Sequence, residues 1–460
     1  MISRHACAAA FGLGLLLLLC VAEGRVAAFP VDGDQTTLPP STELNEDALD
    51  KPREVFRSEM SGGKSYLVSL GNLAFSSPSV LGDVARQAGI SCGTCHVNGA
   101  GNARLFMPKM STRPGNFDTT GPLFNPKADN FMLDPVRIPS LRGARYLAPY
   151  GVDGRMPSLR DFVHSVIVNE FAGPEPSPVV LDAIVAYIQD IDFLANPNLG
   201  PGGRLVGKIS DSERRGEALF ARSFPHDPGM SCAGCHVPSG AFVDHQQHDV
   251  GSGGLFKTPT LRNADFNAPY FHDGRFDTFD QVVAHFDKTF DLGLSAQDKK
   301  DLVAYLTAVG DGTLPFERDG AGASLKEIND FSSVLATAIP ADDKATVSLA
   351  VDTVGRELRE LTERYPDRKN TIVSGGEQER SQARSVLKDI VLGLRRIDVA
   401  VAEGRLNEAT ADYRNYRYLM AAAVPALLTN AEPWSLFNQA VHDRHYGALR
   451  QVMQSKHLSR

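Results

Sequence analysis

The chain has 460 residues, of which 42% are apolar and 22% charged, and its formal net charge is −8. This composition excludes a disordered chain, a collagen-like chain and a polytopic membrane protein. The charge implies no broad basic surface, so nucleic acid is not expected as a partner. At about 150 residues per domain, the length predicts about three domains.

Residues 1–28 have the layout of a secretory signal peptide, with a basic start, an apolar run over 8–21 and small residues after it. The run is short for a membrane-spanning helix. A lipoprotein cysteine at Cys20 and an uncleaved anchor are the other interpretations. We expect the mature chain to be exported, in bacteria to the periplasm, and to begin with an extended polar arm over residues 29–64.

Four cysteines follow this segment, and each belongs to a C-x-x-C-H sequence. Disulfides are the usual interpretation in an exported protein, and a four-cysteine zinc site is another. Neither explains the histidine that follows each pair. C-x-x-C-H is the attachment signature of a c-type haem, in which two thiols form thioethers and the histidine is the proximal iron ligand. The two sequences comprise Cys92, Cys95 and His96, and Cys232, Cys235 and His236. They predict two covalently bound haem c groups.

The sequence around these motifs is duplicated. Residues 139–155 and 259–275 are identical at ten of 17 aligned positions, and both begin with proline and end with Asp-Gly-Arg. Two helical patterns follow each block. They lie at 159–170 and 178–194 after the first block, and at 278–286 and 295–309 after the second. We call residues 65–200 the first half and residues 204–315 the second half, and we predict that each is a helical haem domain. The Pro- and Gly-rich stretch 197–203 is the predicted linker.

The duplicated C-x-x-C-H and the P-[ST]-L-R-x-A-x-x-x-A-P-Y-x-x-D-G-R block resemble the bacterial di-haem cytochrome c peroxidases and their MauG-like relatives, over about residues 65–312. The resemblance implies that hydrogen peroxide reacts at the N-terminal haem and that the C-terminal haem passes or stores electrons. It also implies a periplasmic electron donor or protein substrate, and a calcium ion between the domains, whose ligands the sequence does not place. His96 and His236 are the implied proximal ligands.

Two arginines at matching places in the repeat, Arg142 and Arg262, are candidates to bind haem propionates, because a buried propionate needs a cationic donor. The alternative is that they are ordinary surface or capping arginines.

Peroxide cleavage needs a group that moves a proton between the two oxygens. The resemblance assigns a distal glutamate to Glu170, and His164 on the same predicted helix is the other candidate, as base or as sixth iron ligand. The peroxidases often have a histidine ligand where this chain has Thr112. Met107 and Met110 are the thioethers nearby, and either could ligate the first iron or simply pack.

The second half lacks the expected sixth ligand of its haem. The family has Met or Tyr at the position of Phe286, which cannot bind iron. The neighbouring His285 is the candidate metal ligand, against the alternative of a helix-surface histidine. The weaker alternatives are His245, His248 and His272.

Apolar residues recur at helical spacing over 328–339, 345–361, 386–401 and 413–428, and a last helix is expected from about 434 to 454. Residues 320–460 are therefore predicted to form a helical bundle without covalent haem, used for a homodimer contact or for partner docking. The complete prediction is an all-α fold with two tandem cytochrome c-like haem domains followed by this bundle.

Three functions are compatible with this sequence. The first is a peroxidase or a MauG-like peroxide-dependent oxidase, which needs one open iron. The second is an electron-transfer cytochrome in which both irons are six-coordinate. The third is a structural or sensing haem protein whose C-terminal bundle binds a partner.

Overall fold

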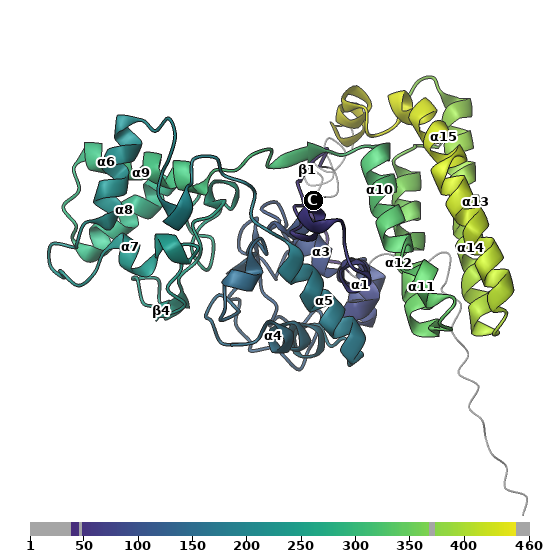
Figure 1. Ribbon diagram of the computed structural model, residues 1–460, viewed down its shortest axis with the longest axis horizontal. Helices are drawn as coiled ribbons and strands as arrows, with labels where there is room; N and C mark the ends of the chain where they lie inside the picture. The colour runs from purple at the N-terminus through teal and green to yellow at the C-terminus, as the bar shows by residue number, and fades with distance from the viewer. Residues whose placement is uncertain (1–37, 46–47, 368–372, 448–460) are drawn as a thin grey trace, which may run out of the picture. The chain divides into compact units, whose positions relative to one another are not determined.

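The computed structural model describes residues 38–45, 48–367 and 373–447 (Figure 1). The predicted signal peptide lies outside the described residues. Helices dominate the described chain, which confirms the predicted mainly helical character, and the strands are only two or three residues long. They form three antiparallel pairs: β1 (Asp50–Pro52) with β6 (Phe316–Arg318), β2 (Asn116–Phe117) with β3 (Val136–Arg137), and β4 (Gln247–His248) with β5 (Phe256–Lys257). No described helix combines the length and the apolar character needed to cross a membrane.

In the first half, two helices pack across each other beside the haem motif. Its helices are α1 (Tyr66–Phe75), α2 (Asp83–Ala88), α3 (Cys92–Cys95), α4 (Leu159–Ser165) and α5 (Pro178–Asp190), and a π-helical turn, Val166–Glu170, continues α4. Ser65 and Ser177 cap α1 and α5, because their side chains accept backbone N–H groups of the first turn. The two helices cross at Gly71, where a Cβ atom would lie 1.9 Å from the carbonyl oxygen of Ala183.

The second half repeats this arrangement. Its helices are α6 (Asp211–Ala221), α7 (Cys232–Cys235), α8 (Phe279–Phe290) and α9 (Ala296–Gly310). Ser210, Thr278 and Ser295 each begin a helix with a capping box. Helices α6 and α9 cross at Gly216, where a Cβ atom would lie 2.0 Å from the carbonyl oxygen of Asp301. The glycine thus sets the same close helix crossing in both halves.

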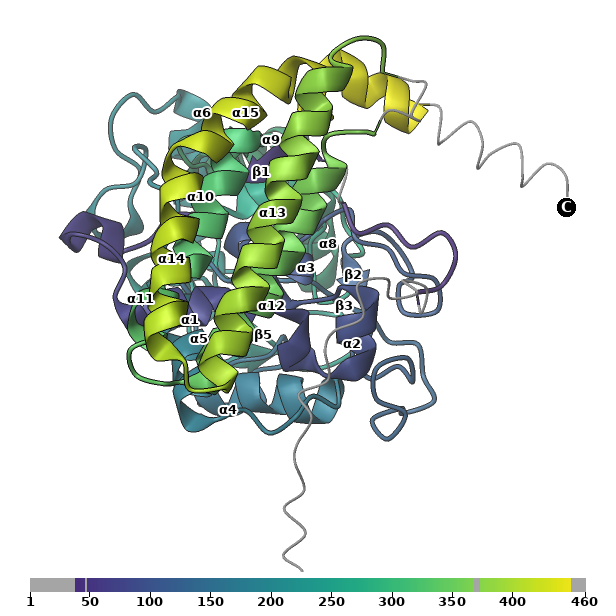
Figure 2. The same cartoon turned by 90° about the vertical axis from the view of Figure 1, so that its right-hand side faces the viewer.

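The C-terminal helices share one apolar core. They are α10 (Ala321–Ser332), α11 (Leu335–Ala338), α12 (Lys344–Glu363), α13 (Glu377–Ala402), α14 (Leu406–Ala421) and α15 (Ala423–Ala431). Helix α13 packs against α12, α14 and α15, and Figure 2 shows these helices side by side. The apolar pattern over 413–428 is interrupted at Ala422. The last helix begins at residue 439 rather than at Trp434, and its predicted continuation over 448–454 lies outside the described residues. Single 3-10 turns lie at Ser58–Ser61, Pro78–Leu81, Val97–Gly99, Ala144–Tyr146, Pro201–Gly203, Pro238–Gly240, Ala264–Phe266 and Glu432–Trp434.

One face of the C-terminal helices covers the first half. Leu70 and Leu73 of α1 belong to the same buried apolar cluster as these helices. Asp352 of α12 accepts a hydrogen bond from the Ser79 hydroxyl at 2.7 Å. Part of the surface that the sequence left free for docking is therefore buried within the chain itself.

The described part of the N-terminal arm is bound into the fold. Strand β1 pairs with β6, which follows the second half. The side-chain amides of Asn98 and Asn102, just after the first haem motif, donate to the backbone carbonyls of Pro52 and Leu44. The arm therefore covers the loop that follows the first C-x-x-C-H sequence.

Candidate functional site

Each C-x-x-C-H sequence forms one helical turn with a polar cap. Helices α3 and α7 begin at the first cysteine of the motif and end at the second. At the first motif the Thr94 hydroxyl accepts the backbone N–H of Ser91 at 3.0 Å, and at the second the Ser231 hydroxyl accepts the backbone N–H of Gly234 at 3.0 Å. Cys92, Cys95, Cys232 and Cys235 form no disulfide with any described residue. Each turn brings together the two cysteines that the haem attachment signature uses.

The two motif histidines are oriented for metal binding through Nε2. Nδ1 of His96 donates to the carbonyl of Pro139 at 2.9 Å, and Nδ1 of His236 donates to the carbonyl of Phe242 at 3.2 Å. A carbonyl can only accept, so in each ring Nδ1 carries the hydrogen and Nε2 keeps its lone pair. Burial lowers the pKa of His96 to about 4 and also lowers the pKa of His236. Both rings are thus held neutral, as iron ligation demands.

Both repeat arginines have a buried Nε atom without a hydrogen-bond partner among the described residues. Arg142 is only 2% exposed, and its Nη2 donates to the carbonyl of Arg53 at 2.6 Å. The guanidinium of Arg262 lies 4.6 Å from the ring centre of Phe193. Buried polar groups are rarely left unpaired in a folded protein. An anionic group at each site would satisfy them, so the two arginines fit the haem propionates assigned to them.

A cavity of about 210 Å³ lies beside Arg142. It is lined by residues of the arm, of the loop after the first haem motif and of the end of the second half: Asn45, Ala48, Asp50, Pro52, Val97, Ala100, Gly101, Asn102, Ala103, Arg104, Arg142, Phe266, Pro315 and Phe316. The arm and both halves thus meet at this candidate cofactor-binding arginine.

Glu170 lies at the end of the π-helical turn and is held by an arginine. Nη2 of Arg155 donates to Oε1 of Glu170 at 2.9 Å, and Nη1 donates to Oδ1 of Asp153 at 3.1 Å. The Glu170 side chain is 12% exposed. π-Helical turns often occur at functional sites. This contact of Arg155 with Glu170 is not predicted from the sequence.

His164 does not join Glu170. Its Nε2 lies 2.9 Å from a carboxylate oxygen of Glu175, and both of these side chains are accessible to solvent. His164 and Glu170, the two predicted catalytic residues, therefore lie on one continuous helix but bind different partners.

His285 is surrounded by aromatic rings and is hydrogen-bonded. Its Nε2 donates to the carbonyl of Val250 at 2.8 Å, and its ring centre lies 4.8 Å from Phe271 and 5.3 Å from Phe276. Iron ligation through Nε2 would require this hydrogen bond to break. Phe286 stacks on Phe290 at 6.0 Å.

The remaining ligand candidates differ in whether a ring nitrogen is paired. Nδ1 of His245 donates to the carbonyl of Ala148 at 2.7 Å. The His272 ring stacks on Phe256 at 3.6 Å, and its buried Nδ1 has no hydrogen-bond partner among the described residues. Met107 and Met110 are buried in the apolar core of the first half.

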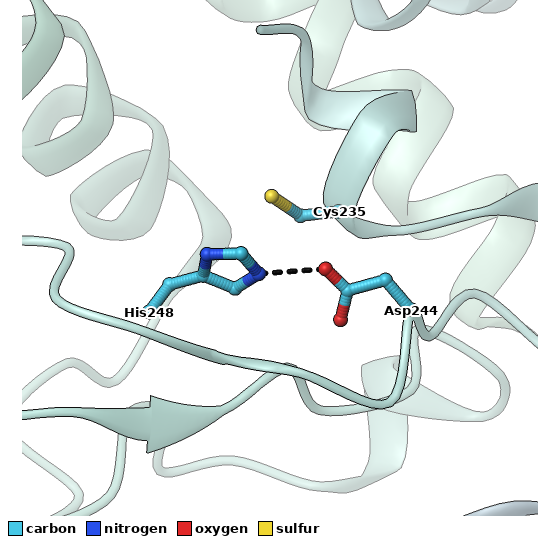
Figure 3. Close-up of side chains that lie close together, drawn as sticks. All are labelled: Cys235, Asp244 and His248. Carbon is cyan, nitrogen blue, oxygen red and sulfur yellow. Dashed lines mark hydrogen bonds and ion pairs between the residues drawn. The ribbon is translucent and has the colours of Figure 1, made fainter.

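One group of three potential metal ligands occurs in the described chain (Figure 3). Cys235, Asp244 and His248 bring their ligand atoms within 4.8 Å of one another, and Nε2 of His248 lies 2.6 Å from Asp244. Calcium prefers six to eight oxygen ligands, which this group does not offer. The structure thus gives no support to the expected calcium ion, and Cys235 is already assigned to haem attachment.

Comparison with known proteins gives one family match. Residues 212–318 match the model described as di-haem cytochrome c peroxidase. The hydrazine synthase subunit gamma of Kuenenia stuttgartiensis is 25% identical, and the match covers 57% of this chain and 83% of that protein. The methylamine utilization protein MauG of Methylorubrum extorquens is 25% identical, with 52% and 76% covered. The cytochrome-c peroxidase IdrP1 of Denitromonas iodatirespirans is 40% identical over 67 residues, which are 12% of this chain and 18% of that protein.

Proposed function

From the confirmed resemblance to the di-haem cytochrome c peroxidase and MauG-like family, we propose that the chain is an exported di-haem c-type cytochrome. It acts as a peroxidase or as a MauG-like peroxide-dependent oxidoreductase in the periplasm. Residues 65–200 and 204–315 are the two haem domains, and residues 320–460 are a C-terminal helical bundle.

Each domain binds one haem c through its own C-x-x-C-H turn. The thiols of Cys92 and Cys95, or of Cys232 and Cys235, form the thioethers. His96 and His236 bind iron through Nε2, which their carbonyl-bonded Nδ1 atoms leave available. Arg142 and Arg262 bind propionates through their buried Nε atoms. Haem bound at these residues would supply the redox chemistry and the binding site for peroxide reduction.

Peroxide reacts in the first half, and the observation that carries this assignment is the pair formed by Glu170 and Arg155. Oε1 of Glu170 is bound to Arg155, so Oε2 is the atom that takes a proton from one peroxide oxygen and delivers it to the other, which leaves as water. At the matching position of its last-but-one helix, the second half has Phe290, which cannot move a proton. The second half therefore serves electron transfer.

Reduction of one peroxide to two water molecules consumes two electrons and two protons. A periplasmic electron donor or a protein substrate supplies the electrons, and the haem held by Cys232, Cys235 and His236 would pass them to the first half. The relatives named MauG and cytochrome-c peroxidase support both kinds of partner.

The test is the optical and EPR spectrum of the diferric protein before and after one equivalent of hydrogen peroxide. We expect one high-spin signal that is lost within seconds. Two low-spin signals that peroxide leaves unchanged, even after partial reduction, would overturn the proposal in favour of an electron-transfer cytochrome with both irons six-coordinate.

A further inference from the structure

The loop that carries Arg155 is held by the second half of the chain. Nζ of Lys257, in β5, donates to the carbonyls of Leu147 at 2.7 Å and Pro149 at 2.6 Å. The backbone N–H of Lys257 donates to the carbonyl of Val152 at 2.9 Å. Lys257 thus spans most of the loop 147–155 with three hydrogen bonds.

A second residue of the same strand pair extends this contact. The side-chain amide of Gln247, in β4, donates to the carbonyl of Asp153. The carboxylate of Asp153 in turn accepts from the backbone N–H of Arg155 at 3.3 Å and from its Nη1 at 3.1 Å. A continuous hydrogen-bonded path therefore leads from β4 and β5 to the guanidinium that holds Glu170.

The first half makes the equivalent contact in the opposite direction. Arg137, the repeat counterpart of Lys257, donates through its backbone N–H to the carbonyl of His272 at 2.6 Å and through Nη1 to that of Asn267 at 3.0 Å. Nδ2 of Asn116 donates to the carbonyl of Asp273 at 3.0 Å. The two halves are thus joined with the reciprocity of an isologous dimer.

The two paths end differently. In the first half, Arg155 reaches a helix carboxylate, Glu170. In the second half, Arg275 pairs with its own turn residue Asp273 and donates to the carbonyl of Ser252 at 3.0 Å. The contacts between the halves are therefore reciprocal, but only the arginine of the first loop binds a carboxylate at the end of the helix that follows.

We propose that Arg155 is a positioning residue for Glu170 and that Lys257 maintains this position from the opposite half. The inference rests on the proposed function, because it gives Glu170 its proton-moving role. Its consequence is that the second haem domain, besides supplying electrons, sets the geometry of the peroxide site in the first.

The experiment measures the second-order rate constant of the haem-loaded, full-length protein with hydrogen peroxide by stopped-flow absorbance. Arg155→Gln should lower it by about tenfold, since small misplacements of a catalytic group cost up to about 100-fold. Arg155→Lys should recover most of the rate, because the cation is retained. Lys257→Met should lower it by about threefold to tenfold.

The matched controls are the repeat counterparts, Arg275→Gln and Arg137→Met. Both should stay within about twofold of the wild type, since the arginine of their loop pairs with Asp273 of the same turn and not with Glu170. Haem content and the ferric spectra, measured on every variant, identify any protein that fails to fold. Arg155 is partly exposed at the surface, so its variants are expected to fold.

A double-mutant cycle separates positioning from a general effect. In a Glu170→Gln background, Arg155→Gln and Lys257→Met should each change the rate by less than about twofold. Undiminished effects in that background would overturn the inference, as would equal losses in Lys257→Met and Arg137→Met. A Glu170→Gln protein with the wild-type rate is a different result, because it would overturn the role of Glu170 in the proposed function.

Discussion

Glu170 and Phe290 occupy equivalent positions of the duplicated sequence, each fifteen residues after the arginine of an Asp-Gly-Arg turn. Around them the two halves keep the same capped helices, the same glycine crossing and the same haem motif. At this position one half has a carboxylate and the other a phenyl ring, which stacks on Phe286. Under the proposed function, the first half is therefore suited to the peroxide reaction and the second half to electron transfer.

This asymmetry leads to a prediction for Glu170→Gln. The amide keeps the shape of the side chain but cannot accept and return a proton, so the rate of the peroxide reaction should fall by about 100-fold or more. The loss of the high-spin ferric signal after peroxide addition measures it. The matched control is Glu175→Gln, which removes the exposed carboxylate beside His164 and should leave the rate unchanged. Equal rates in Glu170→Gln and the wild type would remove Glu170 from the mechanism.

The haem attachment is tested one motif at a time. Replacing both cysteines of one motif by alanine, Cys92 with Cys95 or Cys232 with Cys235, should remove about half of the haem that stays with the denatured protein after acid-acetone extraction, because that motif then forms no thioether. Haem stain of the denatured band measures the effect. Complete loss of haem from the wild-type protein on extraction would contradict covalent attachment at both motifs.

The sequence predicted the haem motifs, the duplication and most helix positions, because these follow from local spacing and capping. The pair formed by Arg155 and Glu170 was not predicted. It joins a turn to the end of a helix, and the apolar periodicity of the sequence does not indicate that this end is π-helical. Contacts between the halves, such as those of Lys257, could not be predicted either, because their acceptors are backbone carbonyls far away in the sequence. His285 shows the reverse case. Its position in the sequence made it a candidate iron ligand, but in the fold its Nε2 is hydrogen-bonded to the carbonyl of Val250.

The arm contains a carboxyl group whose titration should weaken the fold. Burial, opposed by Lys64 and by a hydrogen bond from Tyr187, raises the pKa of Glu54 from 4.5 to about 7. Below pH 4.5 the folded and unfolded chains both hold this proton, so nothing is lost. As pH rises towards 7, the unfolded chain releases the proton first, which lowers the free energy of unfolding by up to about 3 kcal/mol.

Glu54→Gln should remove this contribution. Measured by urea unfolding, the free energy of unfolding of the wild type should fall between pH 5 and pH 8 by about 2 to 3 kcal/mol more than that of the variant. Glu59→Gln, at an exposed position of the same arm, is the control and should follow the wild type. An unchanged pH dependence in Glu54→Gln would show that Glu54 ionises as freely in the fold as in the unfolded chain.

The glycine at the crossing of α1 and α5 should be intolerant of any side chain. In Gly71→Ala the new Cβ would lie 1.9 Å from the carbonyl oxygen of Ala183, so the helices must separate beside the first haem motif. Because overpacking costs about 1 to 3 kcal/mol, the melting temperature should fall by several degrees. Gly393→Ala, whose Cβ would meet only the tip of Arg396 at 3.6 Å, should instead leave it unchanged or raise it slightly. Equal melting temperatures for the two variants would mean that α1 and α5 do not cross this closely in the folded protein.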